Sequence, residues 1–405
     1  MADNKENRIP NVPHLRFPEF CGEWVETTLG KISEITKGSG ISKDQLSEQG
    51  SPCILYGELY TKYKSEIINE VYSRTELEPS SLVKSMANDV IIPCSGETAI
   101  DISTARCVPF DNILLGGDLN IIRHRNDDGG FFAYQLISTG KKDIARVAQG
   151  VSFVHLYGEN LKQIRVYHPN TEEQKKITRL LSLIDERIAT QNKIIEDLKK
   201  LKSAISKHLF ARKDLLETTI CLLDIATLKN GYAFQSGKYN ELGKWKILTI
   251  SNVAGERYIN DENCNCIIDL PNDIQDHQVL KEGDILISLT GNVGRVSLCK
   301  DGDYLLNQRV GLLQLTKNVN QEFLYQILSS QRFENSMIAC SQGAAQMNIG
   351  KGDVESYVLP YSSNINNILL VATILHSYDE YIINEQRRQT LLTMQKQYLL
   401  TQMFI

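Results

Sequence analysis

Residues 171–209 read TEEQKKITRLLSLIDERIATQNKIIEDLKKLKSAISKHL, a stretch that contains neither glycine nor proline. Its apolar residues recur at heptad spacing and form a narrow seam that two polar residues interrupt. This pattern predicts one long coiled-coil helix. A helix over residues 172–209 would extend about 57 Å at ~1.5 Å per residue, longer than the helices of most compact domains. The seam consists of two sets of positions at heptad spacing: Ile177, Ile184, Gln191, Leu198 and Ile205, and Leu181, Ile188, Ile195, Lys202 and Leu209.

The C-terminal end of the chain repeats this seam. Lys396 interrupts it at the position where Lys202 interrupts the first copy. Each seam needs an apolar partner, so we predict that the two helices pair with each other in antiparallel fashion. The alternative is that each helix packs only on its own neighbouring globular block. The seam positions of the second copy are Val371, Tyr378, Glu385, Leu392 and Leu399, and Leu375, Ile382, Gln389, Lys396 and Met403.

The sequence of the globular part of the chain is also repeated. A period of this size duplicates a whole domain together with its helix, so it is not a solenoid unit. The two copies differ most at about residues 37–85 and 229–280, which predicts one scaffold that presents two different surfaces. The matched segments are residues 26–35 with 217–228, 89–92 with 284–287, 132–136 with 323–327, 149–150 with 342–343, 155–156 with 348–349, and 185–188 with 379–382.

These patterns predict an α+β fold with two tandem-repeat globular domains, separated by two long antiparallel coiled-coil helices and related by a pseudo-twofold axis. Strands are expected at residues 54–56, 90–93, 119–123 and 161–167 in the first block and at 247–250, 285–289, 310–315 and 354–359 in the second. Shorter helices are expected near residues 131–147 and 322–339. The predicted divisions are a flexible N-terminus (1–13), a first domain (14–168), a central helix (169–213), a second domain (214–359) and a C-terminal helix (360–405).

Composition indicates an ordinary intracellular protein. Hydrophobic residues make up 42% of the 405 residues, which is enough for a sizeable core in each block. Of the nine cysteines only Cys264 and Cys266 lie close together, a pattern more typical of reduced cytoplasmic thiols than of disulfides or zinc sites. No run approaches the ~20 apolar residues of a membrane span. We therefore expect a cytoplasmic protein.

The charge pattern gives little support for simple polyanion binding. The net charge is −5, and only residues 171–213, with 11 Lys and Arg against 6 Asp and Glu, form a basic segment. Much of that excess could belong to the solvated face of a helix.

Several short catalytic motifs are absent from the sequence. It contains no Walker-type phosphate loop, no His-Glu-x-x-His, no Cys-x-x-Cys and no Pro-Pro of the kind found in adenine methyltransferases. Gly38-Ser39-Gly40 is a fragment of a glycine-rich loop and is better interpreted as a turn. The seven histidines are scattered, and only His155 lies near polar residues specific to the repeat. We therefore expect no catalytic residue and no metal site in this chain.

The arrangement strongly resembles the specificity subunit of type I restriction-modification enzymes. Residues 12–20 (VPHLRFPEF), followed by Gly22-Glu23-Trp24, resemble the N-terminal signature of that family. Residues 283–288 (GDILIS) with 291–294 (GNVG) resemble its internal strand and turn, and residues 169–177 (PNTEEQKKI) resemble the start of its spacer helix. The second helix begins at residues 360–368 (PYSSNINNI) without the Glu-Gln pair, and Asn88 stands where the second copy has Gly283.

The resemblance implies that each block is a target recognition domain that reads one half of a bipartite, asymmetric DNA sequence. The helices would set the spacer between the halves and dock two methyltransferase subunits. S-adenosylmethionine chemistry would belong to those subunits, and ATP, Mg and DNA cleavage to restriction subunits, so this chain itself would be non-catalytic. Sequence reading requires base-edge donors and acceptors on loops, which is compatible with the missing motifs.

Candidate DNA-binding residues follow from matching loops across the repeat. Arg, Asn and Gln can contact guanine or adenine bidentately, whereas tyrosines more often hold phosphate or sugar. The candidates in the first block are Lys37, Ser39, Lys43, Tyr56, Tyr60, Ser95, Thr98, Arg106, Gln149, Ser152 and His155. Their counterparts in the second block are Lys229, Tyr232, Phe234, Asn252, Thr290, Asn292, Arg295, Gln308, Arg309, Gln342, Gln346 and Asn348.

Two other functions remain open at this point. A duplicated coiled-coil adaptor that binds proteins and no DNA would explain the helices and the acidic isoelectric point, but not the two divergent blocks. A single-chain restriction enzyme would require the methylase and ATPase motifs that the sequence lacks.

Overall fold

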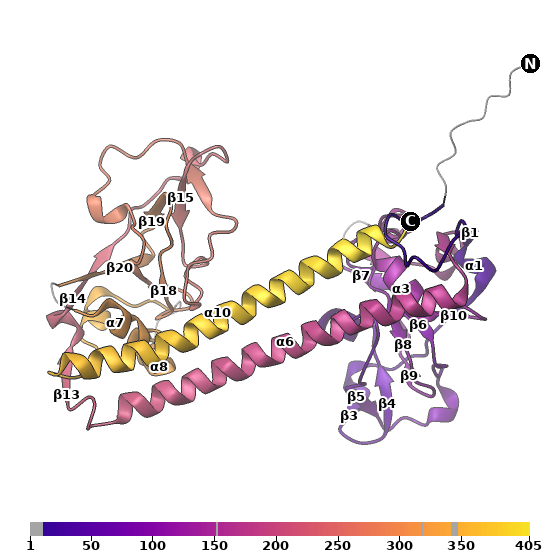
Figure 1. Cartoon of the computed structure of the whole chain (residues 1–405), viewed down its shortest axis with the longest axis horizontal. Helices are drawn as coiled ribbons and strands as arrows, with labels where there is room; N and C mark the ends of the chain where they lie inside the picture. The colour runs from indigo at the N-terminus through magenta and orange to yellow at the C-terminus, as the bar shows by residue number, and fades with distance from the viewer. Residues whose placement is uncertain (1–10, 151–152, 317–318, 342–346) are drawn as a thin grey trace, which may run out of the picture. The chain divides into compact units, whose positions relative to one another are not determined.

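The structure, a computed structural model, describes residues 11–150, 153–316, 319–341 and 347–405. Its internal contacts divide the chain into two compact units, coloured along the sequence in Figure 1. Unit 1 takes in the described residues up to Asn192 together with Arg388–Ile405, and unit 2 is Lys193–Arg387. This division cuts both long helices, so it does not test the predicted domain limits, which stay a prediction.

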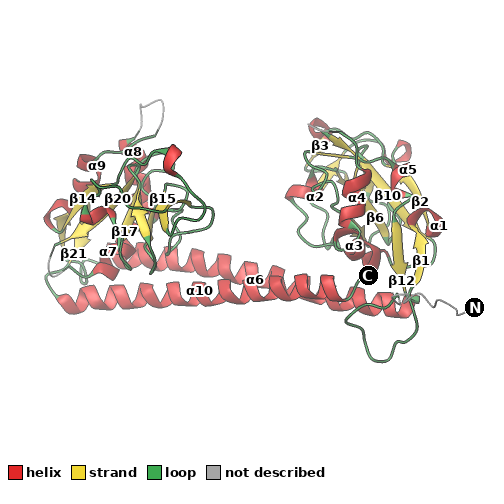
Figure 2. Ribbon diagram, turned by 90° about the horizontal axis from the view of Figure 1, so that it is seen from above, coloured by secondary structure: helices red, strands yellow, loops and turns green. Residues whose placement is uncertain are grey.

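The two predicted coiled-coil helices are α6 (Thr171–Ala211) and α10 (Ile365–Gln402). All of the predicted seam positions are buried or half-buried. In unit 1 the start of α6 and the end of α10 share one apolar core, which contains Leu181 and Met403. In unit 2 the end of α6 shares a core with the start of α10, for example through Leu209 and Leu375. The predicted antiparallel pairing is therefore confirmed within each unit, where the two helices lie side by side (Figures 1 and 2).

The globular part of unit 1 is built on a four-stranded sheet of order β2-β10-β6-β8. A second sheet, β3-β5-β4-β9, contains the parallel pair β4 and β9, and a third small sheet pairs β1 with β12. The elements are β1 (Val25–Thr28), α1 (Leu29–Ile32), β2 (Ser33–Lys37), β3 (Leu46–Ser47), β4 (Ser51–Ile54), α2 (Glu58–Thr61), β5 (Ser73–Thr75), β6 (Asp89–Pro93), β7 (Ser95–Gly96), β8 (Arg106–Val108), β9 (Leu114–Leu115), β10 (Leu119–His124), α3 (Gly129–Ile137), α4 (Lys141–Val147), β11 (Val154–His155), α5 (Gly158–Leu161) and β12 (Arg165–His168).

Unit 2 repeats the main features of this topology, although its second sheet, β16-β15-β19, has three strands. Its four-stranded sheet has the order β14-β20-β17-β18, β15 runs parallel to β19, and β13 pairs with β21. The internal repeat predicted from the sequence is thus confirmed in three dimensions. The elements are β13 (Thr218–Cys221), β14 (Ala226–Asn230), β15 (Trp245–Leu248), β16 (Asn265–Ile267), β17 (Ile285–Ser288), β18 (Val296–Leu298), β19 (Tyr304–Leu306), β20 (Val310–Leu315), α7 (Gln321–Leu328), α8 (Gln331–Cys340), α9 (Lys351–Glu355) and β21 (Val358–Tyr361).

The central strands form where the sequence predicted them. Every residue of β6 and β17 is buried, as expected for short apolar runs covered on both faces. The turn before each strand uses a left-handed residue, Asn88 with φ +80° and Gly283 with φ +86°. Asn tolerates this conformation better than most residues other than glycine, so the replacement of Gly by Asn in the first copy preserves the turn.

Several predicted limits were wrong. The predicted strand at residues 161–167 begins only at Arg165, because Leu161 is the last residue of α5. The predicted strand at 354–359 likewise begins at Val358, because Val354 lies in α9, where the Asp353 carboxylate accepts a hydrogen bond from Gly350 N–H at 2.8 Å. A short apolar run does not distinguish a strand from one turn of helix. Each predicted shorter helix is in fact two helices, α3 with α4 and α7 with α8.

The two long helices begin in different ways. At α6 the Asn170 side chain caps Glu173 N–H at 2.9 Å, and the Glu173 carboxylate accepts two hydrogen bonds of 2.7 Å from Arg16. At α10, which lacks the Glu-Gln pair, the Glu217 carboxylate accepts from Ser362 Oγ and Ser363 N–H, both at 2.7 Å. A carboxylate therefore holds the start of each helix to its own unit. In α6 this carboxylate belongs to the helix itself, and at α10 it comes from Glu217, just before β13.

We expect Asp261 to make the stability of unit 2 depend on pH. Its carboxylate accepts from Lys246 Nζ at 2.7 Å, Lys300 Nζ at 3.0 Å and Tyr304 Oη at 3.1 Å, and these contacts hold its pKa well below the usual value. A lowered pKa stabilises the fold above the unfolded value of about 3.9, and this stabilisation is lost as the pH falls toward the folded value. Between about pH 5 and pH 2.5 the melting temperature of the wild type should fall more steeply than that of Asp261→Asn. A variant of the exposed Asp301, which makes no ion pair within the described residues, should follow the wild type; equal slopes for all three proteins would contradict the prediction.

Candidate functional site

The loops at one edge of each four-stranded sheet bring most of the repeated polar positions together. In unit 1, β2 ends at Lys37 and β6 ends at Pro93, while β10, antiparallel to both, begins beside them at Leu119. In unit 2, β14 ends at Asn230, β17 ends at Ser288 and β20 begins at Val310 in the same way. We call this side of each sheet the loop edge. It comprises the loops that follow β2 and β6 and precede β10 in unit 1, and those that follow β14 and β17 and precede β20 in unit 2.

Matching contacts tie these loops together in both units. Ser39 pairs with Gly116 and Tyr232 with Asn307, both as parallel bridges. Ser95 pairs with His155, and Thr290 pairs with Asn348. Ser39 and Tyr232, Ser95 and Thr290, and His155 and Asn348 therefore occupy equivalent positions in the two copies, as the sequence repeat predicted.

Each loop edge depends on a glycine where two chain segments cross. A Cβ atom on Gly38 would lie 1.9 Å from the carbonyl oxygen of Gly116, and one on Gly231 would lie 2.2 Å from that of Asn307. Neither position can carry a side chain without displacing the backbone. The segment Gly38-Ser39-Gly40 is thus not the predicted turn, because Ser39 forms a parallel bridge to Gly116 and Gly38 allows the two segments to cross.

The side chains at this edge differ between the units although the backbone is equivalent. Before β10, unit 1 has Gly116-Gly117-Asp118, and the matching residues before β20 are Asn307-Gln308-Arg309. Asp118, Gln308 and Arg309 are exposed. Within the described residues the Arg309 guanidinium has no ion pair or hydrogen bond, so it is available to a ligand. Gln308 and Arg309 were predicted from the sequence, whereas Asp118 was not, although the repeat makes it the equivalent of Arg309.

Unit 1 also presents an aromatic group in which the predicted candidate His155 lies between Phe153 and Tyr157, two residues that were not predicted. Phe153, His155 and Tyr157 alternate along the segment around β11, and all three are exposed. The His155 ring lies 5.5 Å from that of Phe153 and 6.3 Å from that of Tyr157, and the Lys37 ammonium lies 5.9 Å from the Tyr157 ring centre. The spacing of two residues is the signal that would have placed these side chains on one face of a strand. Unit 2 has an aromatic pair at a different position, in the loop after β14, where the rings of Tyr232 and Phe234 lie 4.8 Å apart.

Other candidates remain accessible. In unit 1, Lys43 and Tyr56 line a groove of about 890 Å³ whose wall also contains Gly116, Gly117 and Asp118. Gln149 and Thr98 are exposed near β7 and β11, and Thr98 Oγ1 donates to Asp101 at 2.6 Å. In unit 2 the exposed candidates besides Gln308 and Arg309 are Asn292 and Asn348.

Several candidates instead have their side chains engaged inside their own unit. Arg106 is 9% exposed and donates to the carbonyl oxygens of Ala105 and Tyr63, and burial lowers its pKa. Asn252 is 4% exposed and holds Thr249 and Asn260. Neither side chain can reach a base edge in this arrangement, so we withdraw both as base contacts.

Other candidates are engaged through hydroxyl or guanidinium contacts, or have their hydroxyl buried. Ser39 Oγ accepts from Val83 N–H at 2.8 Å, and Tyr60 Oη donates to the Ser95 carbonyl at 3.0 Å. Burial raises the pKa of Tyr60, which therefore remains a neutral donor. The Ser95 and Thr290 hydroxyls are buried, Tyr232 Oη donates to Asp273 at 2.7 Å, and Arg295 Nε lies 3.3 Å from Glu334. Lys229 lines a separate groove with His277 and Gln314. The candidates Ser152, Gln342 and Gln346 lie outside the described residues.

Neither a metal site nor a membrane-spanning helix is found in the part of the chain that the structure describes. No group of three or more His, Cys, Asp or Glu side chains there could hold a metal ion. No helix among these residues is both long and apolar enough to cross a membrane.

The repeated architecture matches one protein family in both halves. The family model of the type I restriction modification DNA specificity domain matches residues 22–200 and again residues 217–393. The chain belongs to this family. The two matched segments correspond to the two structural copies, so the chain carries two specificity domains in tandem, as the sequence resemblance implied.

Known proteins of similar sequence and fold agree with this assignment. The specificity subunit of the type I restriction enzyme MjaVIII from Methanocaldococcus jannaschii is 24% identical over 359 residues, which cover 82% of this chain and 80% of that one. The crystal structure of a type I restriction-modification S subunit from M. genitalium superimposes with a TM-score of 0.62 at 17% identity, over 97% of this chain and 99% of that one. A chain from a structural study of complex assembly and conformational transition of the type I R-M system superimposes with a TM-score of 0.57 at 14% identity, over 93% of this chain and 96% of that one. The chain thus has the fold of a type I specificity subunit.

Proposed function

We propose that each specificity domain reads one half of a bipartite, asymmetric DNA site, and that the paired helices set the spacer and dock two methyltransferase subunits. The observation that carries the proposal is the repeated loop edge, where one backbone presents Gly116-Gly117-Asp118 in unit 1 and Asn307-Gln308-Arg309 in unit 2. Two copies of one scaffold with different hydrogen-bonding groups are suited to two different half-sites.

The chemistry of the loop edges fits a division between base reading and backbone binding. Arg309 and Gln308 can contact guanine or adenine bidentately in the major groove. The exposed Lys37 and the aromatic group around His155 are suited to phosphate and sugar. A chain with a net charge of −5 would obtain the rest of its phosphate affinity from partner subunits.

The proposed complex assigns all chemistry to those partners. The methyltransferase subunits would hold S-adenosylmethionine, and restriction subunits would use ATP and Mg to translocate and cleave DNA. The chain itself would then contribute recognition and geometry without a catalytic residue.

The direct test is to map N6-methyladenine genome-wide in cells with and without this chain. We expect one asymmetric motif of two defined blocks and a fixed spacer, present only when the chain is present. A duplex with that motif should be protected by the chain mixed with its methyltransferase subunit, and changing the spacer alone should remove protection. Absence of any sequence-dependent methylation or protection would remove the proposal in favour of a protein-binding adaptor.

We expect Arg309→Ala to relax the motif at one base pair in one half-site only. Loss of a bidentate contact costs about 1–3 kcal/mol of discrimination, or about 5- to 150-fold at the affected position. The measurement is the motif recovered by methyladenine mapping. Arg332→Ala is the matched control, because Arg332 is an exposed arginine of unit 2 that lines a pocket beside α6. Relaxation in both half-sites, or in the control, would contradict a base-reading role for Arg309.

A further inference from the structure

The same buried ion pair occurs once in each unit. In unit 2, Lys202 Nζ of α6 lies 2.6 Å from Asp379 Oδ1 of α10. In unit 1, Lys396 Nζ of α10 lies 2.6 Å from Asp185 Oδ1 of α6. All four side chains are at least 83% buried, with exposed fractions of 17% and 8% in unit 2 and 14% and 6% in unit 1. The lysines that interrupt the apolar seams thus each meet an aspartate of the opposite helix.

A buried ion pair of this kind is poorly explained by stability alone. The cost of removing both charges from water is comparable to their attraction, and an apolar pair of similar volume is often as stable. The best-attested role of a polar interruption in an apolar seam is to fix register, because it tolerates only one alignment. The Lys–Asp pair therefore provides a fixed reference point on the helices.

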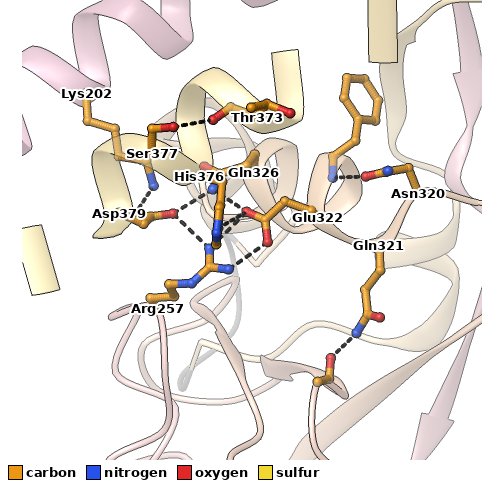
Figure 3. Close-up of polar contacts among 12 residues, drawn as sticks. Lys202, Arg257, Asn320, Gln321, Glu322, Gln326, Thr373, His376, Ser377 and Asp379 are labelled. Carbon is orange, nitrogen blue, oxygen red and sulfur yellow. Dashed lines mark hydrogen bonds and ion pairs between the residues drawn. The ribbon is translucent and has the colours of Figure 1, made fainter. Parts of the chain in front are cut away.

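In unit 2 a globular-domain residue bonds directly to this reference point (Figure 3). Arg257, in the loop between β15 and β16, donates from Nη1 to Asp379 Oδ2 at 2.9 Å. It also donates to both carboxylate oxygens of Glu322 on α7, at 2.9 and 2.6 Å. Gln326 Nε2 completes the group with bonds to Asp379 at 2.6 Å and to Glu322 at 2.7 Å.

The Arg257 guanidinium is held in one orientation and in the charged state. Its side chain is 7% exposed, and it lies over the Tyr325 ring at 5.1 Å from the ring centre. Burial disfavours its charge, but the hydrogen bonds to Glu322 and the neighbouring carboxylates outweigh this effect and raise its pKa. Burial also acts against the Glu322 charge, yet the bonds from Arg257 and Gln326 bring its pKa below the usual value.

Unit 1 has a residue of opposite charge at the same backbone position. Leu298 N–H donates to the Arg257 carbonyl at 2.7 Å, and Cys107 N–H donates to the Glu66 carbonyl at the same distance. The following residues, Tyr258 and Ile67, make equivalent parallel bridges to Leu298 and Cys107. Glu66 and Arg257 are therefore structural counterparts, although they fall in the inserts where the two sequences diverge most.

Glu66, which is negatively charged, contacts the lysine of its helix pair and not the aspartate. Its carboxylate pairs with the ammonium of Lys396, the lysine of the Lys–Asp pair in unit 1, and lies 3.5 Å from Arg106 Nη1. Tyr134 Oη donates to the other member of that pair, Asp185, at 2.7 Å. Thus one globular domain contacts the lysine of its helix pair through a carboxylate, and the other contacts the aspartate through a guanidinium.

We propose that Glu66 and Arg257 are positioning residues that fix each specificity domain on its own helix pair and thereby restrict the spacer length that the protein accepts. This inference rests on the proposed function. Other polar contacts, such as Arg16 with Glu173 in unit 1 and Glu217 with Ser362 in unit 2, hold each domain at the start of a helix. Between these points the domain of unit 2 meets the helices in an apolar core that includes Phe323, Val371 and Leu375, and apolar contacts are non-directional. A bidentate arginine, in contrast, tolerates little rotation. A domain that lacks this bond can tilt on its helices and present its reading loops over a range of positions.

The test is the spacer distribution of methylated sites in cells that carry Arg257→Met with Glu322→Gln. This double variant removes both charges together, leaves Lys202 paired with Asp379, and avoids a buried carboxylate without a counterion. The wild type should methylate sites of one spacer length. The variant should keep both half-site sequences, but its preference over spacers one base pair shorter or longer should fall at least tenfold.

A second variant and a matched control keep the outcome decisive. Glu66→Gln with Arg106→Gln tests the equivalent position in unit 1 and should broaden the spacer in the same way. Lys246→Met with Asp261→Asn removes an ion pair of unit 2 that does not include a helix residue, and it should leave the spacer unchanged. An unchanged spacer in either folded test variant would overturn the inference, and so would equal broadening in the control. Failure of the wild type to give any bipartite motif would instead refute the proposed function.

Discussion

A heptad inserted into both long helices is expected to lengthen the preferred spacer by about three base pairs. Seven residues add ~10.5 Å to a helix at ~1.5 Å per residue, and one base pair of DNA occupies ~3.4 Å. Duplicating residues 186–192 in α6 and 380–386 in α10 keeps the seam in phase and adds no new type of seam residue. Methyladenine mapping reads the result as a motif with unchanged halves and a longer gap.

The single insertions are the controls for this experiment. A heptad in α6 alone preserves its own apolar phase, but Lys202 with Asp379 and Lys396 with Asp185 can no longer form in one common register. We expect such a chain to lose stability and give no new motif. If the doubly extended chain folds and retains the original spacer, the helices do not measure the distance between half-sites.

The long helices and the repeat could be predicted because they depend on local and periodic information. Heptad spacing alone identified helix positions that are buried or half-buried, including the two lysines, but it missed their buried partners Asp185 and Asp379. The shared strands β6 and β17 were recognisable as short apolar runs with turn residues on both sides. The limits at Leu161 and Val354 were wrong because one turn of helix and the start of a strand expose the same short apolar pattern.

The site was harder to predict because a polar residue type does not reveal which way its side chain points. Arg309 and Arg106 looked equally suitable, yet the first is exposed at the loop edge and the second is buried beside Glu66. The equivalence of Glu66 and Arg257 was invisible for a related reason. They have opposite charges and lie in divergent inserts, so only the backbone bonds of Cys107 and Leu298 reveal that they correspond.

The second large effect is expected when one member of a Lys–Asp pair is removed. Asp379→Leu leaves the Lys202 ammonium in an apolar seam without its carboxylate, and Lys202→Met leaves Asp379 with Arg257 as its only cationic partner. Removing one partner of a buried pair costs about 3–5 kcal/mol. We expect a loss of this order for Asp379→Leu in the free energy of unfolding, measured with denaturant. Lys202→Met should cost less, because Arg257 still neutralises the remaining carboxylate.

The double variant separates stability from register. Lys202→Met with Asp379→Leu replaces the pair with apolar side chains and leaves Arg257 bonded to Glu322, so stability should return close to that of the wild type. The exchanged pair, Lys202→Asp with Asp379→Lys, should not recover it, because the new lysine would face Arg257. An isolated ion pair would tolerate that exchange. Recovery by exchange would therefore mean that Arg257 does not act on the helix pair, whereas recovery only by the apolar pair would mean that the three charges act as one unit. In that case the charge at position 257 and the polarity of the helix pair cannot be changed independently.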